Sequence, residues 1–336
     1  MKRTSRLAAL GSLVAGSLLL AACSGSADAT TSSGEEVETV ATIGIGVAPD
    51  FFFSHLYFAV ENGFFAEQGL EATLTEFASG QEATEAVISG QVDLTGTTGP
   101  TVVNFAARDT GVKAIGNYST GEGWFAVVGN EQTKDVKDIE DVAGLKIATQ
   151  FNNAIDRVVR KFLDNHGKDT SFVDYLDVKS PQLVSGLARG DYAAAALWEP
   201  NISTALQNIE GSSILLDSDE AVKMRGYNIF GKEVAEDADV RNRILTALDE
   251  TITWMNENPD EVLAMAMKNS GIKDEELAAS IQAKLTYELD LGQEDLDDIA
   301  AVQDFLEGQG ILEATQEQID ASVGVEEFEA WRAARG

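Results

Sequence analysis

Short apolar segments alternate with amphipathic segments along the first two thirds of the chain. Residues 42–47 form an apolar strand, and residues 54–69 repeat apolar side chains at helical spacing. Ser54 is placed to cap this helix and Gly69 to end it. A strand with alternating apolar and polar side chains follows at 70–77. This alternation predicts an α/β fold with mostly parallel sheets.

The order of elements then repeats. Ser89-Gly90 precedes Pro100 by the same spacing as Arg189-Gly190 precedes Pro200, which indicates two related lobes. The first copy continues with a helix at about 80–89, a strand at 92–95, a loop at 96–99 and a helix whose first turn holds Pro100. The second copy has strands at 145–148, 172–178 and 193–197, helices at 154–165 and 181–188, a loop at 149–153, and a helix opened by Trp198-Glu199-Pro200.

The remaining pattern suggests how the lobes are joined. Two short apolar segments, 124–128 and 228–230, are placed to cross between the lobes as a hinge, and the chain beyond Ala235 is almost wholly helical in pattern. We therefore expect a first lobe at 41–123 and a second lobe at 124–227. Residues 228–336 would be the hinge return and C-terminal helices packed on the first lobe.

The first residues have the pattern of an export signal. Lys2, Arg3 and Arg6 precede an apolar run too short for a good membrane span, which ends in Leu-Ala-Ala-Cys23. We predict a signal peptide at 1–22 and a flexible tether at 23–40. Leu-Ala-Ala-Cys resembles a bacterial lipobox, which implies a diacylglyceryl thioether on Cys23 and anchoring to the outer face of the cytoplasmic membrane. The alternative is a plain signal peptide followed by an accidental cysteine.

Composition excludes several functions. Lys and Arg number 24 against 56 Asp and Glu, a net charge of −32, which argues against a nucleic acid partner and against a basic face for anionic lipid. One cysteine and two histidines exclude a disulfide framework, a Cys/His zinc cluster and an iron–sulfur site. We expect no metal and no cofactor.

Four strand-to-helix loops are the candidate binding elements: 47–53, 96–100, 149–153 and 198–201. In α/β folds, ligands bind at the carboxyl ends of the strands. If the two lobes face each other, four helix N-termini point into one cleft, and their free N–H groups and positive dipole ends suit an anionic or strongly polar ligand.

A series of short motifs in this order resembles the nitrate/sulfonate/taurine-type substrate-binding proteins of ABC importers. The motifs are Phe53–Ala59, Glu61–Phe65, Gly69–Glu71, Phe77–Gly80, Ser89–Asp93, Gly99-Pro100, Gly144–Ala148 and Trp198–Pro200, within roughly residues 41–250. The resemblance implies the periplasmic-binding-protein type II fold, with two α/β lobes that close on a small-molecule ligand, and permease and ATPase partners. We expect a monomer. The chain departs from the family in its third loop, where Gln150-Phe151-Asn152-Asn153 replaces a small Lys-Gly-Ser-type turn.

Each candidate ligand-binding residue has a structural alternative. Trp198 is a candidate pocket wall or an interlobe packing residue, and Glu199 either binds an amine or amidine or caps a helix. Thr97, Thr98 and the Gly99 amide would bind anionic oxygens or form an ordinary turn. The full set predicted to bind ligand is Pro49, Phe52, Phe53, Thr97, Thr98, Gly99, Ser119, Phe151, Asn152, Asn153, Trp198 and Glu199.

Catalysis has little support in the sequence. Pro49 replaces the third glycine of a dinucleotide fingerprint, and no P-loop, His-Glu-x-x-His or Gly-x-Ser-x-Gly motif is present. We predict an ABC-importer binding protein for a small organic anion or zwitterion, with an aliphatic sulfonate or taurine as the leading ligand. The alternatives are a binding protein for an aminopyrimidine precursor of thiamine and an enzyme of the same fold. A pyrimidine requires two opposed rings, whereas a sulfonate requires converging hydrogen-bond donors.

Overall fold

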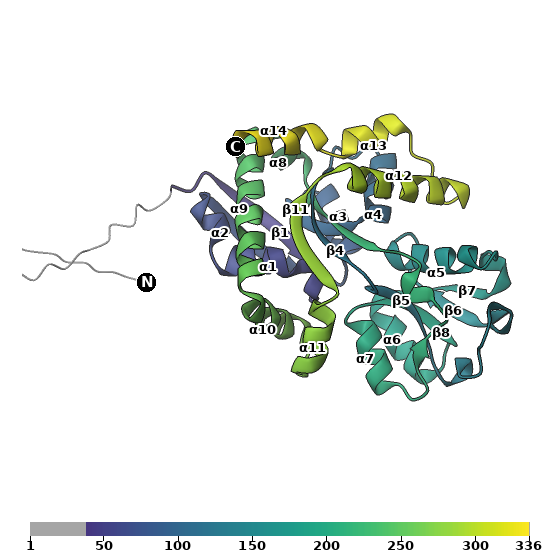
Figure 1. Ribbon diagram of the computed structural model, residues 1–336. Coiled ribbons are helices and arrows are strands. Elements are labelled where there is room, and N and C mark those ends of the chain that lie inside the picture. Colours follow the sequence, from purple (N-terminus) through teal and green to yellow (C-terminus); the bar gives the residue numbers. More distant parts are fainter. Residues whose placement is uncertain (1–37, 336) are drawn as a thin grey trace, which may run out of the picture. The chain divides into compact units, whose positions relative to one another are not determined.

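The computed structural model describes residues 38–335 (Figure 1). The predicted signal peptide, Cys23 and nearly all of the tether therefore lie outside the described residues. None of the helices in the described part of the chain is both long enough and apolar enough to cross a membrane.

The first sheet has six strands in the order β11-β4-β10-β3-β1-β2. β1 is parallel to β2 and β3, whereas β10 is antiparallel to β3 and β4, and β11 is antiparallel to β4. The strands are β1 (Ala41–Val47), β2 (Leu70–Glu76), β3 (Leu94–Thr98), β4 (Lys113–Gly121), β10 (Met224–Phe230) and β11 (Leu285–Asp290).

The second sheet has five strands in the order β7-β6-β8-β5-β9. β6 is parallel to β7 and β8, and β5 is antiparallel to β8 and β9. The strands are β5 (Phe125–Gly129), β6 (Lys146–Thr149), β7 (Asp174–Asp177), β8 (Ala194–Trp198) and β9 (Ser213–Ile214). Each sheet thus has a parallel α/β core with antiparallel strands added, which confirms the predicted fold class.

Helices cover both sheets (Figure 1). The helices of the first half are α1 (Ser54–Glu61), α2 (Phe64–Glu67), α3 (Gly80–Ile88), α4 (Gly99–Ala107), α5 (Ala154–Asn165), α6 (Ser180–Arg189) and α7 (Asn201–Asn208). The C-terminal helices are α8 (Lys232–Glu236), α9 (Ala238–Glu257), α10 (Pro259–Ser270), α11 (Glu275–Gln282), α12 (Gln293–Gly308), α13 (Gln316–Ser322) and α14 (Val325–Arg335). Short 3₁₀ helices occur at Phe51–Phe53, Glu131–Thr133, Ile139–Val142, Thr170–Phe172 and Ser218–Glu220.

We call the six-stranded sheet with its helices the first lobe, and the five-stranded sheet with α5–α7 the second lobe. The C-terminal helices contact the first lobe: α9 contacts β11, α12 and α13 contact α4, and α14 contacts β4. The central strands are apolar on both faces. Ile43 and Ile45 of β1 are fully buried, as are residues 194–196 of β8. Such burial is expected of parallel strands covered by helices on both sides.

Three predicted elements were wrong. The helix expected at 54–69 is broken by Gly63, whose φ of 83° lies in the left-handed region that favours glycine. The loop expected at 96–99 belongs largely to β3, which continues to Thr98. The almost wholly helical pattern expected beyond Ala235 is interrupted by β11, where Leu285, Tyr287 and Leu289 are buried and the two residues between them are exposed.

The two segments predicted to form a hinge are instead strands within the sheets. Residues 124–128 lie almost entirely in β5, which pairs with β8 and β9, and residues 228–230 end β10, which pairs with β3 and β4. The chain passes between the sheets just before β5 and just before β10, at 122–124 and 221–223. Residues 125–128 and 228–230 are largely apolar because they belong to strands that have a neighbouring strand on both sides.

Candidate ligand-binding site

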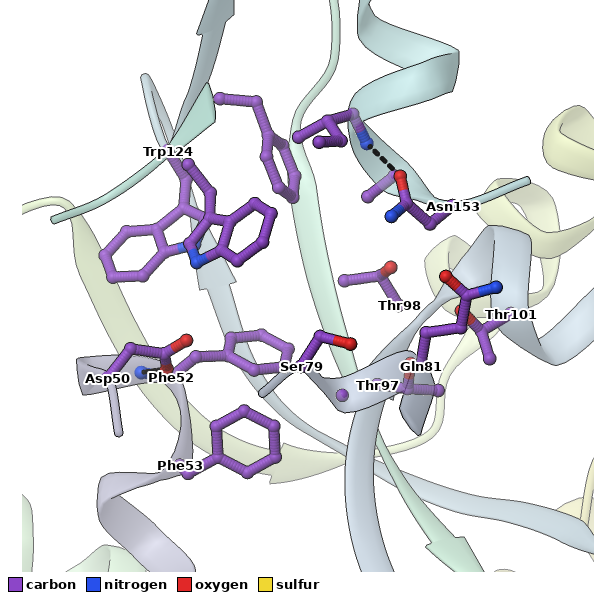
Figure 2. Close-up of a pocket in the computed structure, with 15 residues that line it drawn as sticks. Asp50, Phe52, Phe53, Ser79, Gln81, Thr97, Thr98, Thr101, Trp124 and Asn153 are labelled. Carbon is purple, nitrogen blue, oxygen red and sulfur yellow. Dashed lines mark hydrogen bonds between the residues drawn. The ribbon is translucent and has the colours of Figure 1, made fainter. Parts of the chain in front are cut away.

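A cavity of about 80 Å³ lies between residues of the two lobes (Figure 2). This volume is several times that needed by one water molecule, so the site is suited to a small molecule. The first lobe contributes Asp50, Phe52, Phe53, Ser79, Gly80, Gln81, Thr97, Thr98 and Thr101. The second lobe and the chain entering it contribute Trp124, Phe125, Asn153, Ala154, Ile155 and Trp198.

Strand pairing explains why these residues meet. Thr97 and Thr98 end β3, and Trp198 ends β8, so both sheets present the carboxyl ends of parallel strands to the cavity. β5 runs antiparallel to β8 and places Phe125 opposite Trp198. Trp124, the residue before Phe125, therefore reaches the same end of the second sheet.

Among residues 38–335, Asp50 is the only acidic residue that lines the cavity. Its carboxylate accepts a hydrogen bond from the Phe52 N–H at 2.9 Å and so caps the 3₁₀ helix of Phe51–Phe53. Asp50 is 9% exposed, and burial raises its pKa to about 7 even though hydrogen bonds from Phe52 and the Trp198 side chain favour the ionised form. Among the described residues, those lining the cavity include no Lys, Arg or His. Asp50 thus has hydrogen-bond donors but no cation at the cavity.

The aromatic wall around Asp50 is supported from behind. The rings of Phe52 and Phe53 meet edge to face at 5.5 Å, and Phe52 also packs on Tyr118 at 5.0 Å. A Cβ on Gly96 would lie 2.5 Å from the Tyr118 hydroxyl oxygen, so only glycine leaves room for that ring. Tyr118 in turn stacks on His55, which is fully buried and whose pKa burial lowers to about 3. Phe52 therefore has little freedom to move away from the cavity.

The opposite part of the cavity is polar and neutral. In Figure 2, Asp50 and Trp124 lie at the left of the cavity, whereas Gln81, Thr101 and Asn153 lie at the right. Ser79 caps α3 and Asn153 caps α5 through their side-chain oxygens. The N-caps of α1 and α4, Phe53 and Thr98, also line the cavity, so four helix N-termini border it. Of the four predicted there, those of α1, α4 and α5 are present, whereas that of α7 is not and that of α3 was not predicted.

The structure brings together part of the predicted set. Phe52, Phe53, Thr97, Thr98, Asn153 and Trp198 line the cavity, whereas Pro49, Gly99, Ser119, Phe151, Asn152 and Glu199 do not. Sequence reasoning missed Asp50, Ser79, Gln81, Thr101 and Ile155 as lining residues, and placed Trp124 and Phe125 in a hinge. The available signal was Asp50 itself, an acid in the loop after the first strand and directly before three phenylalanines.

Glu199 lies away from the cavity. It is 0% exposed, forms an ion pair with Lys284, and accepts hydrogen bonds from the Ser203 N–H at 3.1 Å and the Ser203 hydroxyl at 3.0 Å. Lys284 also donates to the Gly123 carbonyl at 3.1 Å. The Glu199 carboxylate therefore holds the start of α7 and the end of β8 against the segment before β11, which is the helix-capping alternative of the sequence analysis.

The other predicted residues outside the cavity have structural positions. A Cβ on Gly99 would lie 3.2 Å from Oδ2 of Asp298, so an internal carboxylate occupies the N-terminus of α4 where a ligand anion was expected. Ser119 is fully buried on β4, and Pro49 is exposed. Phe151 stacks on Tyr175 at 4.9 Å, and the Asn152 N–H donates to Asp156 at 3.0 Å; these contacts fix the loop that carries Asn153.

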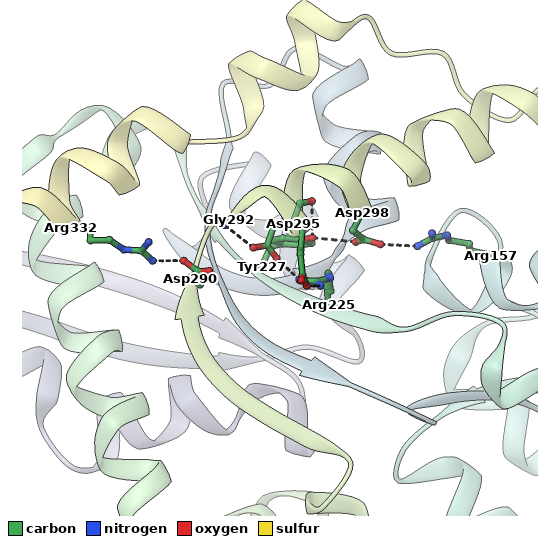
Figure 3. Close-up of polar contacts among 9 residues, drawn as sticks. Arg157, Arg225, Tyr227, Asp290, Gly292, Asp295, Asp298 and Arg332 are labelled. Carbon is green, nitrogen blue, oxygen red and sulfur yellow. Dashed lines mark hydrogen bonds and ion pairs between the residues drawn. The ribbon is translucent and has the colours of Figure 1, made fainter.

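Polar contacts join the lobes around the cavity. The Gln150 amide donates to Oε1 of Gln81 at 2.8 Å. Arg157 of α5 lies 3.5 Å from Asp298 of α12, which also accepts a hydrogen bond from the Tyr227 hydroxyl at 3.1 Å (Figure 3). Among the described residues, no group of acidic, cysteine or histidine side chains is arranged to hold a metal ion.

Two α/β lobes enclosing a small cavity at the carboxyl ends of their strands define the class of two-lobed solute-binding proteins. Residues 50–262 match the NMT1/THI5-like family. The chain therefore belongs to the NMT1/THI5-like family.

Curated relatives are distant but cover most of the chain. The formylaminopyrimidine-binding protein of Halalkalibacterium halodurans is 24% identical over 263 residues, which are 77% of this chain and 78% of the relative. A putative binding protein of Brucella abortus is 23% identical over 215 residues, covering 62% of this chain and 65% of the relative.

Solved structures share the fold. The alkanesulfonate-binding protein SsuA from Xanthomonas axonopodis pv. citri, bound to MOPS, has a TM-score of 0.72 at 15% identity and covers 84% of this chain and 97% of its own. The periplasmic nitrate-binding protein NrtA from Synechocystis has a TM-score of 0.70 at 15% identity, covering 88% and 89%.

The family and its structural neighbours confirm the predicted class. The chain is thus similar to solute-binding proteins of ABC import systems, whose solved structures share its fold. It has the periplasmic-binding-protein fold.

Proposed function

We propose that the ligand is a small aromatic heterocycle bearing an amine, of the aminopyrimidine class, which the protein delivers to its permease. The observation that carries this proposal is Asp50, a buried carboxylate with no cation beside it, set among the rings of Phe52, Trp124 and Trp198. A ring amine or protonated amidine supplies the donors and the positive charge that this carboxylate lacks, and the surrounding rings supply stacking.

The same features argue against the sulfonate that the sequence analysis favoured. A sulfonate carries a full negative charge, and burying it beside Asp50 without a cation is costly. The N-terminus of α4, one of the expected anion sites, already faces Asp298. The N-termini of α3 and α5 remain as dipole ends near the cavity, and they keep an anion as the second candidate. The curated relative that binds formylaminopyrimidine supports the first candidate.

A thermal-shift and calorimetric screen tests the proposal. The panel contains 4-amino-2-methylpyrimidines, taurine, alkanesulfonates and nitrate, each with the purified protein. A ligand at one hundred times its Kd stabilises the protein by about 2.7 kcal/mol, and we expect this only with the aminopyrimidines. Stabilisation confined to sulfonates, taurine or nitrate would contradict the proposal and support an anion receptor.

Two buried carboxylates, Asp50 and Glu199, provide a matched pair of variants. We expect Asp50→Asn to weaken aminopyrimidine binding by about 10- to 100-fold, because a charged hydrogen-bond acceptor is lost. Glu199→Gln should leave affinity within about twofold, since that carboxylate contacts Lys284 and Ser203 and not the cavity. Equal losses in the two variants would remove Asp50 from its assigned role.

We also propose that the protein is a monomer held at the outer face of the cytoplasmic membrane by a lipid on Cys23. The support is the Leu-Ala-Ala-Cys sequence after a basic and apolar leader. In a bacterial host, Cys23→Ser should move the protein from the membrane fraction to the soluble exported fraction and abolish labelling by a radioactive fatty acid. Unchanged membrane association with no label in either form would contradict the lipid anchor.

A further inference from the structure

Gln150 joins the two lobes beside the cavity, and its amide can have only one orientation. It is 8% exposed and follows β6 in the second lobe. Its Oε1 accepts hydrogen bonds from the backbone N–H of Ser180, at 2.9 Å, and from the Ser180 hydroxyl. A backbone N–H can only donate, so the atom facing it must be the amide oxygen. The Gln150 nitrogen therefore points the other way, toward the first lobe.

This orientation determines that of Gln81. Nε2 of Gln150 donates to Oε1 of Gln81 at 2.8 Å, so the oxygen of Gln81 is directed at the other lobe. The Gln81 nitrogen is left as a donor of two N–H groups, and it has no hydrogen-bond partner among the described residues. Gln81 lines the cavity at the end that also carries Thr101 and Asn153, across from Asp50 (Figure 2).

We infer that Gln81 is a specificity-determining residue, oriented by Gln150, that donates a hydrogen bond to an acceptor on the ligand at the end remote from Asp50. This inference rests on the proposed function, because the amine at Asp50 fixes which end of the ligand reaches Gln81. The ligand is thus an aromatic amine that carries an oxygen or ring-nitrogen acceptor on its far side. Since Gln150 belongs to the second lobe, the donor is set only when the lobes lie together as they do here.

Two probes of nearly equal shape test whether Gln81 donates a hydrogen bond to an acceptor on the ligand. Both are 4-amino-2-methylpyrimidines; one carries a methoxymethyl group at position 5 and the other a propyl group, so they differ only in one ether oxygen. The unmodified protein should bind the methoxymethyl probe about five- to tenfold more tightly, the equivalent of one hydrogen bond. Calorimetry on the purified full chain gives the ratio of the two affinities.

Variants of Gln150 test its positioning role. Gln150→Leu should reduce the ratio to about one, because Gln81 is then free to rotate, and Gln81→Leu should do the same by removing the donor. Gln150→Glu should reverse the preference toward the propyl probe, because a carboxylate accepts from the Gln81 nitrogen and turns its oxygen to the cavity. Gln182→Leu, an exposed glutamine on α6, is the control and should keep the ratio of the unmodified protein.

The outcomes distinguish a failure of the proposed aminopyrimidine function from a failure of the inference about Gln81. If the unmodified protein binds neither probe, the proposed aminopyrimidine function and this inference both fail. If it binds both probes equally, the function stands and Gln81 does not contact an acceptor. A preference for the ether that survives both Gln150→Leu and Gln81→Leu in folded protein, as judged by circular dichroism, would also overturn the inference. A change in the overall stability of the protein does not alter the ratio of the two probe affinities. If Gln150 had only a structural role, Gln150→Leu would therefore leave that ratio unchanged.

Discussion

Two buried carboxylates lie close to Trp198, and they have different partners. Glu199, the next residue in the chain, is fully buried and bound to Lys284 and Ser203. Asp50 accepts a hydrogen bond from the Phe52 N–H and lies near the Trp198 side chain, and no Lys, Arg or His among the described residues lines its cavity. The comparison shows that burial alone does not mark a binding carboxylate. A carboxylate whose charge is already balanced serves the fold, and one left without a cation is available to a ligand.

Glu199 and Asp50 have different partners because different strands pass near each carboxylate. Lys284 stands immediately before β11, and β11 pairs with β4 so that Leu285 lies opposite Gly121, close to the crossover into the second lobe. This brings the ammonium of Lys284 to Glu199. Asp50 instead lies in the loop after β1, at the aromatic side of the cavity, where the surrounding side chains are Phe52, Trp124 and Trp198.

The largest expected effect concerns the proton on Asp50. Its pKa is raised to about 7 in the folded protein against roughly 4 in an unfolded chain, so between these pH values only the folded protein holds the proton. The stability of the ligand-free protein therefore falls as pH rises from 4 to 7, by about 4 kcal/mol for a shift of this size. Asp50→Asn should remove this loss and raise the melting temperature at pH 8 relative to the unmodified protein.

Melting curves across pH 4–8 measure this effect as the difference between the protein and its variant. Asp304→Asn, an exposed aspartate on α12, serves as the control and should give a curve parallel to that of the unmodified protein. Parallel curves for Asp50→Asn as well would show that Asp50 ionises normally, and the comparison with Glu199 would fail.

The second-largest expected effect concerns Glu199, the carboxylate that is paired with Lys284. Lys284→Met leaves Glu199 buried without its cation, and we expect a loss of about 3 kcal/mol, the lower end of the range for a broken buried pair because Lys284 is partly exposed. The double variant Lys284→Met/Glu199→Gln should recover most of this loss. Urea denaturation measures both, with Lys273→Met on the exposed surface as control. No recovery in the double variant would mean that Lys284 acts through packing.

The parts of the fold that follow local rules were predictable. The parallel strands and their helices have strong apolar periodicity and caps, and α5 begins and ends at the predicted residues 154 and 165. The antiparallel strands β5, β10 and β11 were assigned to a hinge or to helices. Their identity as strands depends on partners far away in sequence, such as β4 for β11, and not on local pattern.

The residues of the candidate site can also be divided into those predictable from local sequence and those whose place depends on distant segments. Thr98, Asn153 and Trp198 were found because strand ends and helix starts mark ligand sites in α/β folds. Trp124 was missed because its place at the cavity depends on β5 lying antiparallel to β8. Glu199 was included in the predicted ligand-binding set, with helix capping as its alternative, because β11, which brings the preceding Lys284 to it, was not predicted. The contact of Gln150 with Gln81 joins two lobes, so neither local segment contains a sign of it.

Asp298 is a third carboxylate, intermediate between the other two, and gives the smallest effect. It lies at the N-terminus of α4, accepts a hydrogen bond from Tyr227 at 3.1 Å, and faces Arg157 of the second lobe at 3.5 Å (Figure 3). Asp298→Asn keeps a group of the same shape and an oxygen for Tyr227, but removes the charge that attracts Arg157 and the helix dipole. We expect a loss of about 0.5–1 kcal/mol, seen as a two- to fivefold weaker ligand affinity because the pair forms between the lobes.

Salt distinguishes this electrostatic contribution from packing. The affinity difference between the protein and Asp298→Asn should shrink when ionic strength is raised from 0.05 to 1 M, since both side chains are partly exposed and screening at 1 M acts within about 3 Å. The corresponding difference for Asp50→Asn should persist, because Asp50 is buried beside Phe52, Trp124 and Trp198, and buried charges are screened much less by salt. If the Asp298→Asn difference were independent of salt, Arg157 and Asp298 would be neighbours by packing alone, and closure of the lobes would depend on the ligand and on Gln150.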